Sequence, residues 1–189
     1  MGFPCQKSGV SPMKLKMSGL LGFVCVCLMG SADLSGETIR FPRHPALSPD
    51  GLWAYFDSDG DLWRVSSSGG RAERLTAHGA HDRRPMISPD GKWIAFESHR
   101  HGSWDLYLMP VEGGRVRRLT WHSETERLAS WWPDSSGVLF TARRGYSHAK
   151  RFHFLLPLDG SPAIRMLAAD GFLAAVAPDQ DRIAFVRGG

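Results

Sequence analysis

Residues 88–120 decide the fold: they read Ser-Pro-Asp-Gly-Lys-Trp-Ile-Ala-Phe at 88–96 and Asp-Leu-Tyr-Leu-Met-Pro-Val-Glu-Gly-Gly-Arg-Val-Arg-Arg-Leu-Thr at 105–120. Ser-Pro-Asp-Gly is typical of a turn, because proline presets φ and the glycine accepts the left-handed conformation. Ile94 and Phe96 then share one face, and this alternation of branched and aromatic residues predicts a strand. Asp-Leu-Tyr-Leu-Met predicts a second strand, and the Gly-Gly pair predicts its hairpin to the Arg-Leu-Thr strand.

The same pattern occurs four times along the chain. The prolines of the four turns lie 40, 44 and 45 residues apart, and each is followed seven residues later by a phenylalanine: Pro49, Pro89, Pro133 and Pro178. Residues 61–76 align without a gap on residues 105–120, whereas the third copy is degenerate. With a short first strand before each proline, as at 86–88, each unit predicts four antiparallel strands. Four strands at this period are one blade of a β-propeller, with a β-sandwich as the alternative.

The fourth copy differs in its turn. Gln180 stands where the second copy has Gly91. We expect Gly91 to adopt a positive φ, and we expect the turn at Gln180 to be looser or differently built, because glycine is the residue that enters this region without strain.

The first 32 residues have the order of a secretory signal peptide. Lys14 and Lys16 precede an apolar run at 20–29, and small residues follow at 30–32. The apolar run is too short to span a bilayer comfortably, and a buried N-terminal helix is the alternative. All three cysteines lie in this segment, so we expect a mature chain without disulfides. We predict a signal peptide at 1–32, a short linker at 33–44 and a partial propeller at 45–189, with units at about 45–84, 85–128, 129–173 and 174–189.

Composition and charge restrict the function. The chain is 42% hydrophobic, 22% charged and 11% aromatic, which excludes a disordered or collagen-like protein. Beyond residue 32 there are 20 basic and 19 acidic residues, so the net charge there is +1. The basic pI therefore belongs mostly to the leader, and we predict no nucleic-acid partner.

The histidines are the first candidates for chemistry. His78, His81 and Asp82 have the spacing of a metal clip, to which His99 and His101 could add ligands. However, His78 and His122 hold equivalent places after Arg-Leu-Thr, hence in successive blade-to-blade loops that lie apart. Zinc needs three or four ligands at one point, so we predict no metal site.

Other residue patterns favour structure over catalysis. The recurrence of Ser-Pro-Asp favours a turn over a nucleophile, and no Gly-x-Ser-x-Gly elbow is present. We therefore predict no catalytic and no cofactor-binding residues. Asp61 and Asp105 are predicted to accept backbone hydrogen bonds at a turn. Trp53 and Trp93 are repeat-equivalent, which favours packing between blades over ligand stacking.

Three arginine pairs remain, with two interpretations. They could form a patch for acidic peptides, or a solvated surface, which the mature charge near +1 favours: Arg83-Arg84, Arg117-Arg118 and Arg143-Arg144.

The repeat resembles the PD-type WD-like propeller repeat, found in TolB, in tricorn-type peptidases and in prolyl-oligopeptidase relatives. The opening run 43–51, followed by Gly-Asp-Leu-Trp at 60–63, looks like the start of a secreted bacterial tricorn homologue. TolB carries an α/β domain before its propeller, for which the chain has no room. The resemblance implies a second propeller, a PDZ module and a serine-peptidase domain in the parent protein. None of these is visible in the sequence, so no catalytic residue is carried over.

The sequence holds three units and the beginning of a fourth, so we expect a fragment or truncated product, with closure by self-association as the alternative. We expect a non-catalytic propeller segment of an exported, periplasmic or extracellular, bacterial tricorn-like peptidase. It would gate or select peptide substrates or scaffold the peptidase domain. The alternatives are a TolB-like periplasmic protein-interaction module and a truncated product without independent function. The expected partner is a peptide or protein ligand, or the rest of its own longer chain, with no cofactor and no membrane span after signal cleavage.

Overall fold

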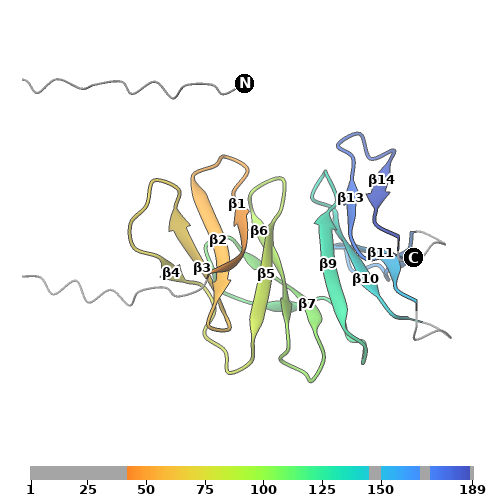
Figure 1. Ribbon diagram of the computed structural model, residues 1–189, viewed down its shortest axis with the longest axis horizontal. Coiled ribbons are helices and arrows are strands. Elements are labelled where there is room, and N and C mark those ends of the chain that lie inside the picture. Colours follow the sequence, from red (N-terminus) through yellow and green to blue (C-terminus); the bar gives the residue numbers. More distant parts are fainter. Residues whose placement is uncertain (1–41, 145–149, 167–170, 188–189) are drawn as a thin grey trace, which may run out of the picture. The chain divides into compact units, whose positions relative to one another are not determined.

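The computed structural model describes residues 42–144, 150–166 and 171–187 (Figure 1). The predicted signal peptide at 1–32 lies outside these residues. Within the described residues the structure is all-β, with fourteen strands and no helix. No helix long and apolar enough to cross a membrane occurs in this part of the chain.

Most strands form three antiparallel sheets of four, each following chain order from its first to its fourth strand. Blade 1 consists of β1 (Arg43–Leu47), β2 (Trp53–Ser58), β3 (Asp61–Ser66) and β4 (Glu73–Arg74). Blade 2 consists of β5 (Asp82–Ile87), β6 (Trp93–Ser98), β7 (Asp105–Pro110) and β8 (Arg117–Arg118). Blade 3 consists of β9 (Glu126–Trp131), β10 (Gly137–Ala142), β11 (Phe152–Pro157) and β12 (Ile164–Arg165). A fourth sheet pairs β13 (Ala174–Val176) with β14 (Ile183–Phe185).

The sheets pack against one another in chain order. The first strand of blade 2, β5, contacts the first strand of blade 1, β1, and the first strand of blade 3, β9. In turn, β9 contacts β13 of the fourth sheet. Figure 1 shows the sheets following one another across the unit, from β1 to β14. This arrangement confirms propeller blades of four antiparallel strands, three of them followed by a two-stranded fourth sheet.

The four turns before the second strands share one backbone conformation. The residue after Pro-Asp has φ of 72° at Gly51 and Gly91, 65° at Ser135 and 64° at Gln180. In each turn its N–H donates a 2.9 Å bond to the carbonyl oxygen three residues earlier. The expected positive φ of Gly91 is confirmed. The expectation of a different turn at Gln180 is wrong, because the Asp179 carboxylate accepts the N–H of the residue two positions on, as Asp90 does in blade 2.

The core lies between the blades. Blade 2 presents Ile94, Phe96 and Met109 to blade 1, and Leu106 and Leu108 to blade 3, all of them buried. Both faces of its sheet are therefore apolar, as the middle layer of a stack requires. Burying each such side chain contributes about 1.5–3 kcal/mol before entropy is counted.

The two repeat-equivalent tryptophans differ. Trp53 packs against the core between blades 1 and 2, with the Arg64 guanidinium 4.5 Å from its ring centre. Trp93 is 37% exposed, so the prediction of packing between blades is wrong for it. The position of Arg64 is taken in blade 2 by Leu108, which is buried in the other core and leaves no cation over Trp93.

Candidate functional site

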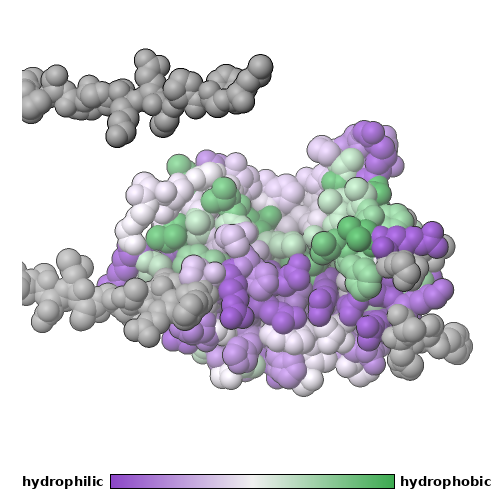
Figure 2. Space-filling model, viewed as in Figure 1, coloured by the Kyte–Doolittle hydropathy of each residue, from purple (hydrophilic) through white to green (hydrophobic). Residues whose placement is uncertain are grey.

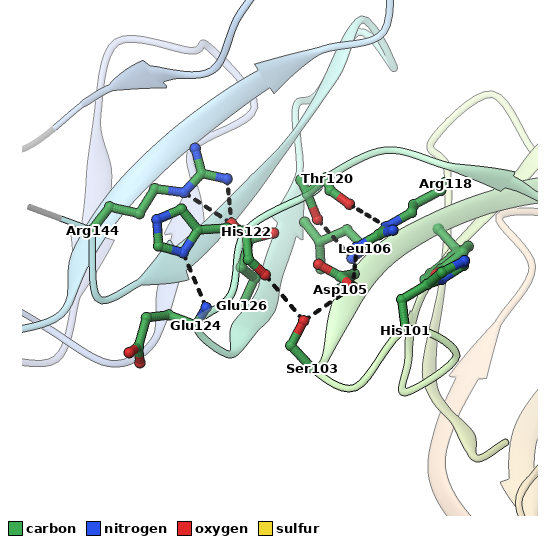
Figure 3. Close-up of polar contacts among 11 residues, drawn as sticks. His101, Ser103, Asp105, Leu106, Arg118, Thr120, His122, Glu124, Glu126 and Arg144 are labelled. Carbon is green, nitrogen blue, oxygen red and sulfur yellow. Dashed lines mark hydrogen bonds and ion pairs between the residues drawn. The ribbon is translucent and has the colours of Figure 1, made fainter.

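The predicted turn aspartates bind side chains rather than the backbone. Asp105 accepts a 2.8 Å bond from Arg118 Nη2, and Asp61 accepts the equivalent bond from Arg74. The backbone N–H after Asp105 instead donates to Thr120 Oγ1, at 3.0 Å (Figure 3). The predicted partner was therefore wrong: the carboxylate at the strand start binds an arginine on the neighbouring strand of the hairpin, and the threonine hydroxyl accepts the backbone N–H.

Blade 3 replaces this ion pair. Phe152 stands at the position of Asp105, and Arg165 stands at the position of Arg118. The Arg165 guanidinium lies 3.6 Å from the Phe152 ring centre, a cation–π contact at the place where blade 2 has the Asp105–Arg118 ion pair.

A second arginine in blade 2 and another in blade 3 hold the start of the first strand of their own blade. Arg100 Nη2 donates to Asp82 at 2.7 Å, and Arg144 Nε donates to Glu126 at 2.9 Å. Both carboxylates are fully buried. Arg144 also lies 5.0 Å from the ring centre of Phe140, so the guanidinium is fixed by charge and by stacking.

A third set of carboxylates joins one blade to the next. Asp57 in blade 1 accepts the backbone N–H of Arg84 in blade 2 at 3.0 Å. Glu97, at the equivalent place in blade 2, accepts the backbone N–H of Leu128 in blade 3 at 3.0 Å. Glu97 also accepts a 2.9 Å bond from Arg83 Nε. These acids are structural links between sheets.

The histidines are not gathered at one point. His78 and His122 each accept, through Nδ1, the backbone N–H two residues on, which shows that their loops are equivalent. His99 packs on Trp104, and His101 Nδ1 lies 2.7 Å from the Tyr107 hydroxyl. In the described part of the chain, no group of three or more His, Cys, Asp or Glu side chains is placed to hold a metal ion.

The arginine pairs do not form one patch. Arg83 and Arg84 lie against Glu97, while Arg118 and Arg144 are paired with other buried acids. Arg117, Arg118 and Arg144 are nevertheless brought to one place, because they line the same depression between blades 2 and 3.

This depression, which we call the inter-blade groove, encloses about 540 Å³. Blade 2 contributes the segment from Arg117 to His122, and blade 3 contributes Arg144 and the segments 156–158 and 160–163. Of the described residues that line it, four are basic and none is acidic: Arg117, Arg118, Arg144 and His122. Figure 3 shows the Arg118 and Arg144 ends of this arrangement with their acidic partners.

Trp121 stands at the groove and is 71% exposed. The Arg118 guanidinium lies 5.8 Å from its ring centre. Sequence reasoning missed Trp121 as a candidate, although an aromatic residue in a blade-to-blade loop beside an arginine pair was the available signal.

Several of the exposed apolar residues lie toward the two ends of the series of sheets. Leu47 and Leu52 are exposed in blade 1, and Phe172, Leu173 and Val186 are exposed beside β13 and β14. Figure 2 shows separate hydrophobic areas on the surface, divided by a hydrophilic band. Phe185 is 37% exposed, whereas its equivalents Phe96 and Phe140 are fully buried.

Comparison with known proteins agrees with this architecture. TolB from Acinetobacter baumannii is similar with a TM-score of 0.66 and 22% identity, over 77% of this chain and 37% of that one. The tricorn protease is similar with a TM-score of 0.65 and 18% identity, over 74% of this chain and 14% of that one. A chain of the nidogen/laminin complex has a TM-score of 0.62 at 11% identity, over 77% of this chain and 56% of that one. At these identities the likeness concerns the fold, and the chain spans only part of each relative.

The family comparison goes further. Among curated protein sequences no significant match was found. The family model described as the tricorn protease N-terminal beta propeller domain matches residues 39–189, which is well over half of the chain. The protein therefore belongs to the family of tricorn protease N-terminal β-propeller domains.

Proposed function

We propose that the chain is a non-catalytic propeller segment of an exported bacterial tricorn-like peptidase, in which it gates or selects peptide substrates or supports the peptidase domain. The observation that carries the proposal is the family match over residues 39–189. A TolB-like module that binds folded periplasmic proteins is the competing function.

The serines of the Ser-Pro-Asp turns support a non-catalytic role. Ser88 Oγ donates to Asp90 at 2.6 Å and accepts the backbone N–H of Trp93 at 2.9 Å. Ser48 does the same with Asp50 and Trp53. A hydroxyl held on both sides by its own turn is a structural group, since a nucleophile needs an adjacent base and a free approach.

The exposed apolar positions support contact with further chain. Leu47 is 64% exposed, whereas the repeat-equivalent Ile87 packs against the core between blades 1 and 2. A core position without a covering sheet favours another blade as its partner. This supports the rest of the same longer protein as one partner, beside a peptide ligand.

Export is proposed from the pattern of residues 14–32. N-terminal sequencing of the chain secreted by a bacterial host should begin near Asp33, the residue after the predicted cleavage site. Soluble cytoplasmic protein that retains residues 1–32 would contradict export.

The experiment that tests the function has two arms. In the first arm, cleavage of a fluorogenic peptide by the 189-residue chain is measured with and without a serine-trap inhibitor. We expect no cleavage that the inhibitor suppresses. When the chain is immobilised on a column, it should retain members of a mixed decapeptide pool. It should not retain control peptides made of glycine and serine. Inhibitor-sensitive turnover would overturn the non-catalytic role, and retention of folded periplasmic proteins without any peptide would favour the TolB-like function.

A further inference from the structure

We propose that the inter-blade groove binds an extended acidic peptide, one that carries a carboxylate beside a large apolar side chain. This rests on the proposed function in that it takes the ligand to be a peptide. It adds where the peptide binds, between blades 2 and 3, and the chemistry by which it is recognised.

The charge of the groove is the first argument. Among the residues that the structure describes, its lining includes three arginines and one histidine and no carboxylate. Arg117 is exposed and makes no ion pair with the residues that the structure describes. His122 Nδ1 accepts the N–H of Glu124 at 3.1 Å, so a neutral ring carries its hydrogen on Nε2 and can donate there. A ligand complementary to this lining is an anion.

The two remaining arginines are fixed in advance. Arg118 uses Nε on the Thr120 carbonyl oxygen at 2.7 Å and Nη2 on Asp105, and Arg144 uses Nε and Nη2 on Glu126. In both, Nη1 makes no hydrogen bond with any residue in the described ranges. Held arginines lose little side-chain entropy when a carboxylate binds, which favours recognition of an acid by Nη1.

The apolar lining is the second argument. Leu119 and Leu156 are buried in the groove wall, and Pro157, Pro162 and Ala163 continue it along blade 3. Trp121 adds an exposed ring at the same place. An apolar ligand side chain that covers the leucine, proline and tryptophan surfaces removes them from water, which favours binding. A bare inorganic anion would contact only the basic part of the groove.

The size of the groove favours a short stretch of peptide. A volume of about 540 Å³ lies within the range of sites that enclose small ligands or a few residues. An extended peptide alternates its side chains, so one side chain can lie on the leucines while a neighbouring carboxylate meets an arginine. An extended peptide with a carboxylate beside an apolar side chain therefore complements both the basic and the apolar lining of the groove.

Fluorescence polarisation of the 189-residue chain with a fluorescein-labelled heptapeptide of alternating leucine and glutamate tests the site. The glutamine counterpart of that peptide should bind about tenfold or more weakly, because each carboxylate–arginine pair would be lost. Arg117→Glu and Trp121→Ala should each weaken binding about tenfold. The matched controls are Arg115→Glu, an exposed arginine outside the groove, and Trp93→Ala, an exposed tryptophan outside it; they should bind like the unaltered chain.

The outcomes separate the two proposals. Peptide binding that Arg117→Glu and Trp121→Ala leave unchanged would overturn the groove and keep the peptide-binding function. Failure of the chain to bind this heptapeptide and every member of the decapeptide pool would overturn both. Equal binding of the glutamate and glutamine peptides, or binding to phosphatidylglycerol vesicles in preference to the peptide, would overturn recognition of an acidic peptide. Because all four substitutions are at exposed positions, unchanged thermal unfolding of each variant is the expected control.

Discussion

The junction between blades 2 and 3 and the junction between blade 3 and the fourth sheet are built on equivalent positions with different side chains. In blade 2 the cross-strand pair is Glu97 with Leu106, and in blade 3 it is Thr141 with His153. Glu97 accepts the backbone N–H of the next blade, whereas Thr141 Oγ1 is buried without a hydrogen bond to any described residue.

The buried leucine of one junction is a histidine in the other. His153 is fully buried, and its ring lies edge-on to Phe185, 5.5 Å between centres. Neither ring nitrogen makes a hydrogen bond of normal geometry with the described residues. A Cβ added at Gly171 would lie 2.7 Å from the His153 ring, so the ring requires glycine beside it. The comparison teaches that equal burial does not mean equal stability, because unmatched polar groups cost free energy.

The largest expected effect is at the well-matched junction. Glu97→Ala should lower the free energy of unfolding by about 3–5 kcal/mol, because it strands the Leu128 N–H and removes the buried partner of Arg83. Thr141→Ala, the matched change in blade 3, should cost less than about 1 kcal/mol, since it removes no hydrogen bond. Urea unfolding followed by tryptophan fluorescence measures both. Equal losses would mean that the carboxylate links contribute nothing specific.

Exchanging the paired residues sharpens the same comparison. Leu106→His should destabilise the chain by about 2–3 kcal/mol, because it buries a polar ring in an apolar core. His153→Leu should raise the free energy of unfolding at pH 7.5 by about 1 kcal/mol. The same urea titration measures the free energy of unfolding of both variants. A loss of stability in His153→Leu would contradict our account of the junction between blade 3 and the fourth sheet.

The pH dependence should belong to one junction. Burial lowers the pKa of His153, so the folded protein keeps this ring neutral where the unfolded chain already takes up a proton. Stability from the neutral ring is therefore present above the unfolded pKa of about 6.5 and is lost as the pH falls toward the folded pKa, by at most about 1.4 kcal/mol per pH unit. The stability difference between His153→Leu and the unaltered chain should grow from pH 7.5 to pH 5.5. A constant difference would show that His153 does not titrate with unfolding.

The turn substitutions should have small effects compared with the loss of the Glu97 link. Gly91→Val should cost about 1–2 kcal/mol, because a branched side chain is strained at a φ of 72°. Ser135→Gly relieves the same strain but removes the acceptor of the Asp90 N–H, so its net effect should lie within about 0.5 kcal/mol of zero. Thermal melts of the two variants compare them, and an unchanged melt for Gly91→Val would contradict the strain.

The blades could be predicted from the sequence because their signals are local. Proline and aspartate set each turn within four residues, and alternation sets the strand that follows. The turn at Gln180 is also set locally, because the Asp179 carboxylate accepts a backbone N–H within the turn. The prediction from glycine alone did not include this hydrogen bond.

The junctions and the groove could not be predicted in the same way. Asp105 could reach its partner Arg118 only after a hairpin had aligned residues 13 apart. The partner of Glu97 is a backbone group of the next blade, 31 residues away, which leaves no trace in residue identity. The groove joins Trp121 to residues beyond 155 across two sheets. Such features depend on how neighbouring blades stack. The repeat indicates that the blades stack, but it does not determine which side chains of neighbouring blades come into contact.

The carboxylate links have a consequence for local opening of the fold. The amide protons of Arg84 and Leu128 are each held by an acid of the preceding blade, at 3.0 Å. Such protons can exchange with solvent deuterium only when two neighbouring blades part, while ladder amides within a blade exchange when that sheet frays. The two amides are therefore built-in reporters of blade separation, and their relative exchange rates would give the order in which the stack comes apart.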